Sequence, residues 1–459
     1  MDSQSIVIVS NRGPVSYALD EFGEPQARRG SGGLVTGLSM LGERGDCRWI
    51  AAAFTDGDRI VASRGDIDAS GFGLRLLDFE PQVWRNHYDV VSNETLWFLH
   101  HGLFDVPIEP SFDDRWREAW ADHRRVNLAF AEAVADLAPT GAIVLAQDYH
   151  LTLLGRLLRE RRPDLRTIHF HHTPFCSPDE IAMLPDDIAD ELLDGLAGYD
   201  ALGFHTPMWA SRYEAVASFL GAPQPRRFVA PLGVDAIDLE LAASAASCER
   251  EVERLSELVG DRHFIARVDR IELSKNLLRG FDAYEVLLER EPSWRERVVF
   301  GAFVYPSREG VPAYARYREQ VEQRVAAINQ KWATNDWTPI ALEMDDDFPR
   351  SLAALRINDV LMVNPVRDGL NLVAKEGPII NDRHGGLVLS NRAGAAHELG
   401  DCCDLINPFD VAATASALSA ALSRDDESRI ALATRRREVA LARDPQQWLH
   451  DQLASLRGE

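Results

Sequence analysis

Short apolar runs alternate with amphipathic helical stretches along the first half of the chain. The runs at residues 5–10, 142–146, 167–171 and 201–205 have the length of strands, and helical spacing appears between them, for example at residues 151–162. Short continuous apolar runs are typical of strands that are buried on both faces of a sheet. The alternation therefore predicts an α/β fold with a parallel, doubly wound sheet.

The same alternation resumes after a connector at residues 221–227. Strands are predicted at residues 263–268, 297–304, 339–344, 359–363 and 386–390, with helices between them. Two alternating stretches of this length predict two α/β domains, residues 1–235 and residues 236–439. The polar residues 20–29 predict a loop, and residues 427–456 predict a helical tail.

Charge and composition argue against several classes of partner. The 459 residues carry a formal charge of −23, which disfavours nucleic acid or an anionic membrane as the main partner. The sequence has no apolar stretch of about 18 residues that could span a membrane, and its first apolar run is too short for a signal peptide. The five cysteines lack paired C-x-x-C spacing, which favours free thiols in a reducing cytoplasm over disulfides or a zinc site.

Polar residues follow the predicted strands of the first half. Arg12, Asp148 and His172 each come directly after one of the apolar runs. Ligands of doubly wound sheets bind beyond the carboxyl ends of the strands. A glycine-rich turn at residues 30–37 leads into a helix whose first N–H groups could hold a phosphate, although such turns are also typical of flexible loops. Arg12 beside this turn favours an anion site.

Cations occupy the strand ends of the second half as well. Arg270 follows the run at residues 263–268, Lys275 comes shortly after it, and Arg308 follows the run at residues 297–304. A single arginine at such a place is usually a surface residue. Because these cations repeat at several strand ends of an acidic chain, we interpret them as ligands of an anionic substrate.

The stretch at residues 363–376 combines a strand end, a tight turn and a helix that begins near Asn371. Helix N-termini bind anions, because their backbone N–H groups carry a partial positive charge. Asp368 in the turn could bind sugar hydroxyls, and Glu376 in the helix could bind a ribose diol. The stretch therefore predicts a nucleotide-sugar site, with an ordinary turn and a helix-capping Asp368 as the alternative.

Two further clusters leave alternatives open. Residues 84–105 are rich in aromatic and histidine side chains at a spacing that fits neither helix nor strand, and they form either a wall for a sugar ring or core packing. Asp345, Asp346 and Asp347 could bind Mg²⁺, but acidic residues also favour the start of the helix that follows them. The histidine pairs at residues 100–101 and 171–172 lack a carboxylate at ligand spacing. We therefore predict no metal site.

Eight motifs in chain order resemble the trehalose-6-phosphate synthase family. They are Val9-Ser10-Asn11-Arg12, Gly32-Gly33-Leu34, Ser92-Asn93 with Leu96-Trp97, Asp148-Tyr149-His150-Leu151, His172 with Pro174-Phe175, Arg270 with Ser274-Lys275, Pro306-Ser307-Arg308, and the run from Arg367 to Glu376. The resemblance implies a GT-B type glycosyltransferase with two facing Rossmann-like domains, an active site in the cleft between them, and a C-terminal helix at about residues 440–459 that crosses back to the first domain. It also implies retaining transfer of glucose from a nucleotide-glucose to glucose 6-phosphate, giving α,α-trehalose 6-phosphate, without a metal or another cofactor.

The resemblance also implies a role for each site residue. Arg12, Tyr88, Trp97 and Arg308 would hold glucose 6-phosphate; Asp148 would orient that acceptor; Gly33, Arg270 and Lys275 would hold the donor diphosphate; His172, Asp368, Leu370 and Asn371 would hold the donor glucose; Leu372 would approach the diphosphate or ribose; and Glu376 would bind the ribose hydroxyls. Of these, Asp148, His172, Arg270 and Lys275 are expected to act in catalysis.

Several positions depart from the usual motifs of that family. Gln147 replaces a common histidine, Cys176 follows Phe175 in place of proline, and Leu273 and Asn276 flank Ser-Lys where Tyr and Gly are usual. These departures leave the donor open among UDP-, GDP- and ADP-glucose. They also leave open another phosphorylated acceptor, such as glycerol 3-phosphate or a cyclitol phosphate, and a non-catalytic sugar-phosphate sensor. A homo-oligomer is compatible with the sequence.

Overall fold

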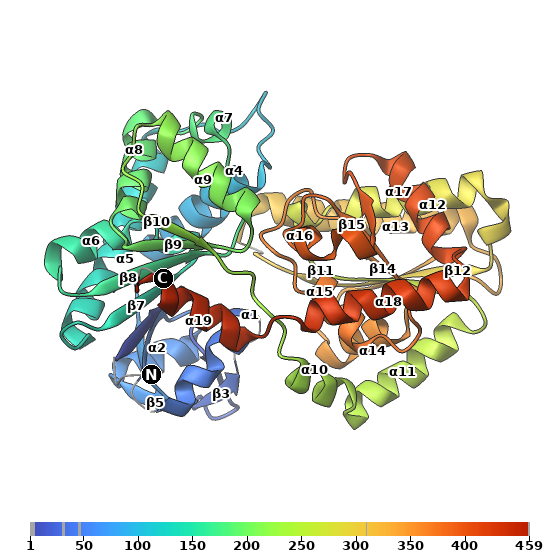
Figure 1. Ribbon diagram of the computed structural model, residues 1–459, viewed down its shortest axis with the longest axis horizontal. Helices are drawn as coiled ribbons and strands as arrows, with labels where there is room; N and C mark the ends of the chain where they lie inside the picture. The colour runs from blue at the N-terminus through green and yellow to red at the C-terminus, as the bar shows by residue number, and fades with distance from the viewer. Residues whose placement is uncertain (1–4, 30–32, 45–46, 309, 458–459) are drawn as a thin grey trace. The chain divides into compact units, whose positions relative to one another are not determined.

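The computed structural model describes residues 5–29, 33–44, 47–308 and 310–457 (Figure 1). The chain forms two compact units, Met1–Leu232 together with Pro445–Glu459, and Gly233–Asp444. The last residues of the chain thus belong to the same unit as the first. Among the described residues, we find no helix with the length and apolar character needed to cross a membrane.

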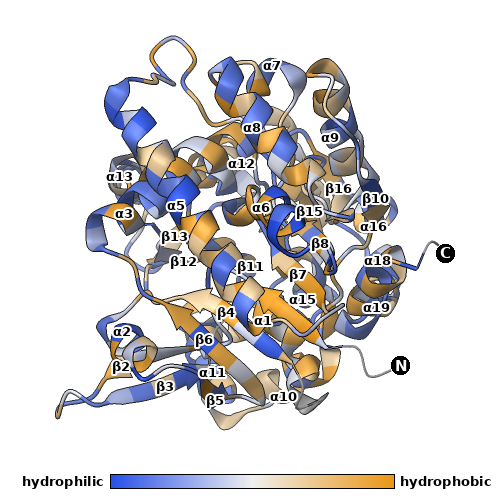
Figure 2. Cartoon of the chain, turned by 90° about the vertical axis from the view of Figure 1, so that its left-hand side faces the viewer, coloured by the Kyte–Doolittle hydropathy of each residue, from blue (hydrophilic) through white to orange (hydrophobic). Residues whose placement is uncertain are grey.

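The first unit is built on an eight-stranded sheet with the order β10-β9-β8-β7-β1-β4-β6-β5. The strands are β10 (Arg226–Val229), β9 (Ala201–Phe204), β8 (Arg166–His171), β7 (Ile143–Gln147), β1 (Ile6–Val9), β4 (Arg48–Ala52), β6 (Phe72–Leu77) and β5 (Ile67–Ala69). β5 pairs antiparallel with β6, and the other neighbours pair parallel. The predicted parallel sheet is therefore confirmed. β1 and β7 are buried along their whole length, as Figure 2 reflects in the hydrophobic colour of β7, because both faces are covered.

Helices cover this sheet on both faces, with α8 and α9 above the strands and α19 below them in Figure 1. The helices are α1 (Gly33–Leu38), η1 (Ser39–Arg44), α2 (Asp56–Ser63), α3 (Pro81–Arg85), η2 (Asn86–Leu96), α4 (Trp97–His101), α5 (Asp114–Leu137), η3 (Tyr149–Leu151), α6 (Leu154–Arg161), α7 (Pro178–Ile181), α8 (Asp186–Ala197), α9 (Pro207–Phe219) and α19 (Pro445–Ser455). α19 packs against α1 and β10, and its Trp448 contacts Phe170 of β8 edge to face at 5.1 Å.

Two local predictions for the first unit differ from the structure. Residues 20–29 were expected to form a loop, but β3 (Pro25–Arg29) pairs antiparallel with β2 (Val15–Leu19) in a separate hairpin. The aromatic stretch around Tyr88 has no 3.6-residue period because η2 is a π-helix.

The second unit contains a six-stranded sheet in which every neighbouring pair is parallel. Its order is β13 (Ile340–Glu343), β12 (Val298–Pro306), β11 (His263–Ile271), β14 (Val360–Val363), β15 (Gly386–Ser390) and β16 (Asp404–Ile406). All five strands predicted for this half are present. β11 extends beyond the predicted residue 268, so Arg270 lies within the strand.

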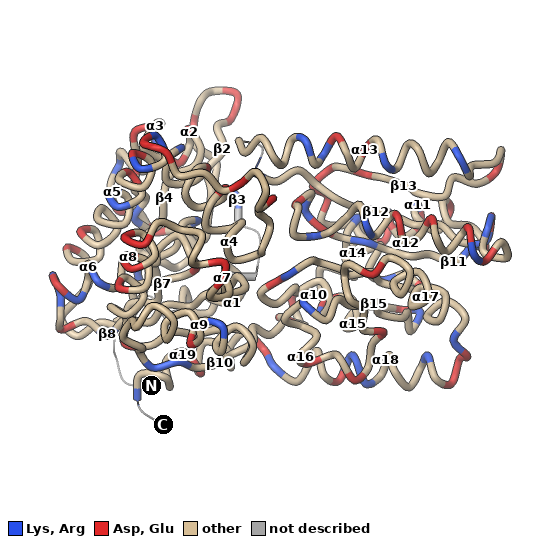
Figure 3. Tube along the Cα trace, turned by 90° about the horizontal axis from the view of Figure 1, so that it is seen from above, with Lys and Arg blue, Asp and Glu red and all other residues tan. Residues whose placement is uncertain are grey.

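The helices of the second unit enclose two apolar clusters. They are α10 (Ala236–Ala243), α11 (Ala246–Val259), η4 (Leu273–Lys275), α12 (Leu277–Arg290), η5 (Pro292–Trp294), α13 (Pro312–Trp332), α14 (Phe348–Ile357), α15 (Val373–Ile380), α16 (Ala396–Leu399), η6 (Gly400–Cys402), α17 (Val411–Leu422) and α18 (Asp426–Leu441). Acidic and basic residues both occur along α13 and α18 in Figure 3, as expected for helices with a solvated face.

Candidate active site

Arg12 lies at the end of β1 in the first unit, in contact with two aromatic rings. Its guanidinium lies 4.4 Å from the ring centre of Phe54, and it donates to the hydroxyl of Tyr88 at 3.4 Å. A cation over an aromatic face is attracted to the ring, and this contact uses none of the guanidinium N–H groups, which can still bind an anion. The structure thus brings together Arg12 and Tyr88, two of the residues that the family resemblance assigned to glucose 6-phosphate.

The aromatic cluster around Tyr88 is extensive. Tyr88 stacks on Trp84 with 5.4 Å between ring centres, and its ring is nearly parallel to that of His150 at 6.0 Å. Trp97 is buried and stacks on His101 at 3.9 Å. Trp97 therefore contributes to the core of the first unit, and its assignment to the acceptor stays a prediction.

Asp148 and His172 meet at the ends of the neighbouring strands β7 and β8. Asp148 has a positive φ of 70°, which is uncommon outside glycine, and the backbone N–H of His172 donates to its Oδ1 atom at 3.2 Å. Backbone strain held in this way is often found where a side chain must point into a binding site.

The imidazole of His172 belongs to a directed chain of hydrogen bonds. The backbone N–H of Leu232 can only donate, so Nδ1 of His205, 3.4 Å away, must accept. Nε2 of His205 then donates to Nδ1 of His172 at 3.2 Å, and Nε2 of His172 donates to Oε1 of Gln147 at 2.9 Å. Burial lowers the pKa of His172 to about 3. His172 is therefore neutral, with its proton on Nε2.

Gly33 is the first residue of α1, so the helix begins within the stretch 30–37 that was predicted to be a turn leading into a helix. Residues 30–32 of that turn lie outside the described part of the chain, so its suggested phosphate contacts stay a prediction.

In the second unit the predicted cations gather at the carboxyl ends of the adjacent strands β11, β12 and β14. Lys275 lies 2.8 Å from Oδ2 of Asp368 and 3.5 Å from Oδ1 of Asp269. Arg270 and Arg308 both donate to the buried carboxylate of Glu272.

The charges of this group stabilise one another. Burial alone would lower the pKa of Lys275, but the carboxylates of Asp368 and Asp269 outweigh it and raise that pKa. Burial alone would raise the pKa of Glu272, but Arg270 and Arg308 outweigh it and hold that pKa at about 2. Lys275 and Glu272 are therefore both ionised at neutral pH.

The turn after β14 is held by Asn371. This residue has a φ of 77°, its Nδ2 donates to Asp368 at 3.1 Å, and its Oδ1 accepts from the backbone N–H of Ala374 at 3.1 Å. A hydrogen bond to the first turn of α15 thus comes from Asn371, and the role of Asp368 stays a prediction. Leu370 is buried below the turn, and Leu372 directly precedes α15.

Glu376 lies in the first turn of α15 and is partly buried. Burial raises its pKa from the ordinary 4.5 to about 7. A carboxylate in this condition binds a proton or a hydroxyl donor readily, since both relieve the cost of a buried charge.

The acidic run near residue 346 forms the start of a helix. Asp347 caps α14 by accepting from the backbone N–H of Arg350 at 2.9 Å, and Arg350 lies 3.2 Å from the same carboxylate and 3.7 Å from that of Asp345. Among the described residues, we find no group of three or more His, Cys, Asp or Glu side chains suited to a metal ion.

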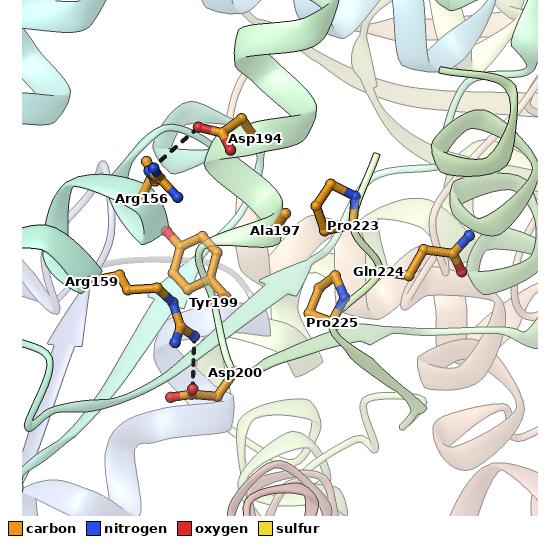
Figure 4. Close-up of a pocket in the computed structure, with 9 residues that line it drawn as sticks. All are labelled: Arg156, Arg159, Asp194, Ala197, Tyr199, Asp200, Pro223, Gln224 and Pro225. Carbon is orange, nitrogen blue, oxygen red and sulfur yellow. Dashed lines mark hydrogen bonds and ion pairs between the residues drawn. The ribbon is translucent and has the colours of Figure 1, made fainter. Parts of the chain in front are cut away.

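A separate hollow of about 410 Å³ lies in the first unit, at the end of the sheet where its parallel strands begin (Figure 4). Arg159 donates to Asp200 at 2.9 Å, and Arg156 lies 3.5 Å from Asp194. Asp200 directly precedes β9, so this hollow lies at the amino ends of the strands, whereas Asp148 and His172 of the same unit lie at their carboxyl ends.

Sequence reasoning missed Glu272, Asp269 and His205 as members of the site. Glu272 and Asp269 carry a signal, because they flank Arg270 in the chain, but carboxylates are common throughout so acidic a chain. The place of His205 depends on the pairing of β8 with β9, which no local pattern shows.

Two units with parallel sheets, and with cations, carboxylates and a helix N-terminus at the carboxyl ends of their strands, define a GT-B type glycosyltransferase. A model of glycosyltransferase family 20 matches residues 4–458. The chain belongs to this family.

Relatives and solved structures agree with that placement. The chain is 33% identical over 478 residues to the trehalose-6-phosphate synthase of Mycolicibacterium vanbaalenii, covering 98% of this chain and 95% of that protein. It is 33% identical over 473 residues to the bifunctional trehalose-6-phosphate synthase/phosphatase of Thermoproteus tenax, covering 98% of this chain and 63% of that longer protein.

Two solved structures superpose over nearly the whole chain. One is described as "Trehalose-6-phosphate from E. coli bound with UDP-2-fluoro glucose", with a TM-score of 0.88, 28% identity and 99% of both chains covered. The other is an α,α-trehalose-phosphate synthase (UDP-forming) from Burkholderia xenovorans in complex with glucose-6-phosphate, with a TM-score of 0.85, 26% identity, and 99% of this chain and 100% of that chain covered.

Proposed function

We propose that this glycosyltransferase moves glucose from a nucleotide-diphosphate glucose to glucose 6-phosphate and forms α,α-trehalose 6-phosphate. One observation carries the proposal: Arg270, Lys275 and Arg308 converge at the carboxyl edge of one parallel sheet, beside the first turn of α15. Cations gathered in this way are suited to phosphorylated sugars. The names of the relatives and the ligands of the two solved structures support the same substrates.

The donor occupies the second unit in this proposal. Arg270 and Lys275 hold the diphosphate, and the N–H groups beyond Asn371 add partial positive charge. As the glycosidic bond breaks, negative charge develops on the leaving diphosphate, and these fixed groups stabilise it. Such a cation set can meet that charge in a metal-independent reaction. Glu376 accepts hydrogen bonds from the ribose hydroxyls.

The acceptor phosphate is held by Arg12 and Arg308, and Tyr88 supports Arg12 through its hydroxyl. Asp148 orients the acceptor sugar. Its strained backbone and its hydrogen bond from the His172 N–H support a fixed direction for the carboxylate.

We propose that the reaction retains the configuration at the anomeric carbon. Retaining hydrolases use a carboxylate as nucleophile. Here both candidate carboxylates are already engaged, Asp368 by Lys275 and Asn371 and Asp148 by the backbone N–H of His172, so we assign neither of them as a nucleophile. A donor phosphate oxygen then takes the proton of the acceptor hydroxyl on the same face of the sugar. Holding both substrates in the reactive orientation supplies much of the rate.

The five cysteines, all free thiols, support a cytoplasmic setting.

The purified chain should be incubated with UDP-, GDP- or ADP-glucose, each with glucose 6-phosphate, glycerol 3-phosphate or a cyclitol phosphate. We expect release of nucleoside diphosphate, with an equal amount of disaccharide phosphate, only when glucose 6-phosphate is present. A faster reaction with another acceptor, or no turnover with any donor, would contradict the proposal.

A further inference from the structure

Glu272 connects two arginines that come from different strands. Arg270 belongs to β11, and Arg308 follows β12. Their Nη1 atoms lie 2.6 Å and 2.5 Å from the same oxygen, Oε1 of Glu272, and Ser307 donates to that oxygen at 3.0 Å. One carboxylate oxygen therefore contacts both guanidinium groups.

The surroundings leave this oxygen little freedom. The side chain of Glu272 is completely buried, whereas that of Arg270 is 38% exposed and that of Arg308 is 8% exposed. Arg308 also has a positive φ of 49° and lies within 3.4 Å of the Tyr314 hydroxyl. Arg270 is thus partly exposed to solvent, whereas the side chain of Arg308 and the carboxylate that both arginines contact are buried.

We propose that Glu272 is a positioning residue that aligns the donor-binding and acceptor-binding arginines together. The inference rests on the proposed function, in which Arg270 holds the donor diphosphate and Arg308 the acceptor phosphate. Because both depend on one oxygen, a single change at Glu272 weakens the binding of both substrates. A change at either arginine alone weakens mainly the substrate that it holds.

A purely electrostatic role would have the opposite sign. A negative charge beside two phosphate sites repels anions, so its removal would tighten the binding of both substrates if position did not matter. Loss of the carboxylate also leaves two cations close together without the negative charge between them, and their repulsion would move them apart. The direction of the change in affinity therefore distinguishes alignment from simple charge.

The test compares Glu272→Ala, Glu272→Gln and the unsubstituted chain by calorimetry, with UDP and glucose 6-phosphate as separate probes. Glu272→Ala should weaken both ligands by about tenfold or more. Glu272→Gln keeps an oxygen for the arginines, so its loss should be smaller but of the same sign. Michaelis constants for both substrates should rise in parallel with these losses.

Glu343→Gln is the matched control, because Glu343 bridges Arg254 and Arg350 in the same unit at 3.0 Å and 2.9 Å. It should leave both affinities unchanged, which separates alignment from a general loss of an ion pair. Thermal unfolding checks that each variant is folded, and Glu272→Gln keeps the test valid if Glu272→Ala does not fold.

Unchanged or tighter binding of either ligand by the folded Glu272 variants would overturn the inference and leave the proposed function intact. If the unsubstituted chain binds neither probe and does not turn over, both are overturned.

Discussion

The raised pKa of Glu376 has a measurable consequence for the stability of the fold. In the unfolded chain this carboxyl has its ordinary pKa of 4.5, and burial raises the value in the folded chain to about 7. The folded state therefore holds the proton more tightly, and its stability falls as the pH rises through this range. Glu376→Gln removes the titrating group and should remove this loss.

The magnitude follows from the two pKa values. A difference of one between the folded and unfolded pKa corresponds to about 1.4 kcal/mol, so the full effect is roughly 3 kcal/mol, of which about 2.5 kcal/mol falls between pH 5 and pH 8. The gain in the free energy of unfolding from Glu376→Gln should grow by this amount as the pH rises. At low pH, where the carboxyl is protonated in both states, the glutamine should offer little advantage.

The assay is urea unfolding of both proteins at pH 5, 6, 7 and 8, with the difference in unfolding free energy plotted against pH. Glu438→Gln, at a side chain 61% exposed on α18, controls for the loss of one negative charge. A difference between the Glu376 variant and the unsubstituted chain that stays constant from pH 5 to pH 8 would refute the reasoning.

Four other outcomes are expected. The dissociation constant of the nucleotide-glucose should rise as the pH falls below 7, because protonation of Glu376 leaves one oxygen fewer to accept from the two hydroxyls of the ribose diol, and a Glu376→Gln variant with the same pH dependence would contradict this. Arg308→Ala should weaken glucose 6-phosphate by about 2–5 kcal/mol in calorimetry while donor affinity stays nearly intact; equal losses of both would show a structural role. His205→Leu removes the donor to Nδ1 of His172 and should lower the free energy of unfolding, measured by thermal unfolding, by about 1–3 kcal/mol. His205→Gln should restore part of this free energy, and equal stability of the two variants would refute the hydrogen-bond chain. Asp347→Ala should cost about 1 kcal/mol of stability through the lost cap and leave the turnover rate unchanged with or without Mg²⁺, and a loss of Mg²⁺-dependent turnover would revive the metal alternative.

Nine strands of the two sheets, β1, β7, β8, β9, β11, β12, β13, β14 and β15, could be predicted because they are short apolar runs, and a parallel sheet buries such runs on both faces. The strands β4, β5, β6 and β16 were not predicted. The hairpin β2–β3 was not predicted because β3 is polar and pairs with β2 outside the main sheet. The helical structure around Tyr88 was not predicted because a π-helix does not have the 3.6-residue period of an α-helix.

The candidate site shows the same division. Arg270, Lys275 and Arg308 were found because each stands near a strand end in the chain. Glu272 was missed as their common partner, because the contact depends on the parallel pairing of β11 with β12. Local pattern indicates which residues lie at an edge of a sheet, but side-chain partners follow from register and packing.

A crystal structure of the chain with UDP and glucose 6-phosphate bound would test the central claim most directly. We expect the diphosphate on Arg270 and Lys275, and the phosphate of glucose 6-phosphate on Arg308, with the arginines still held by Glu272. Ligands bound elsewhere, with Arg270 and Arg308 touching neither phosphate group, would contradict the account.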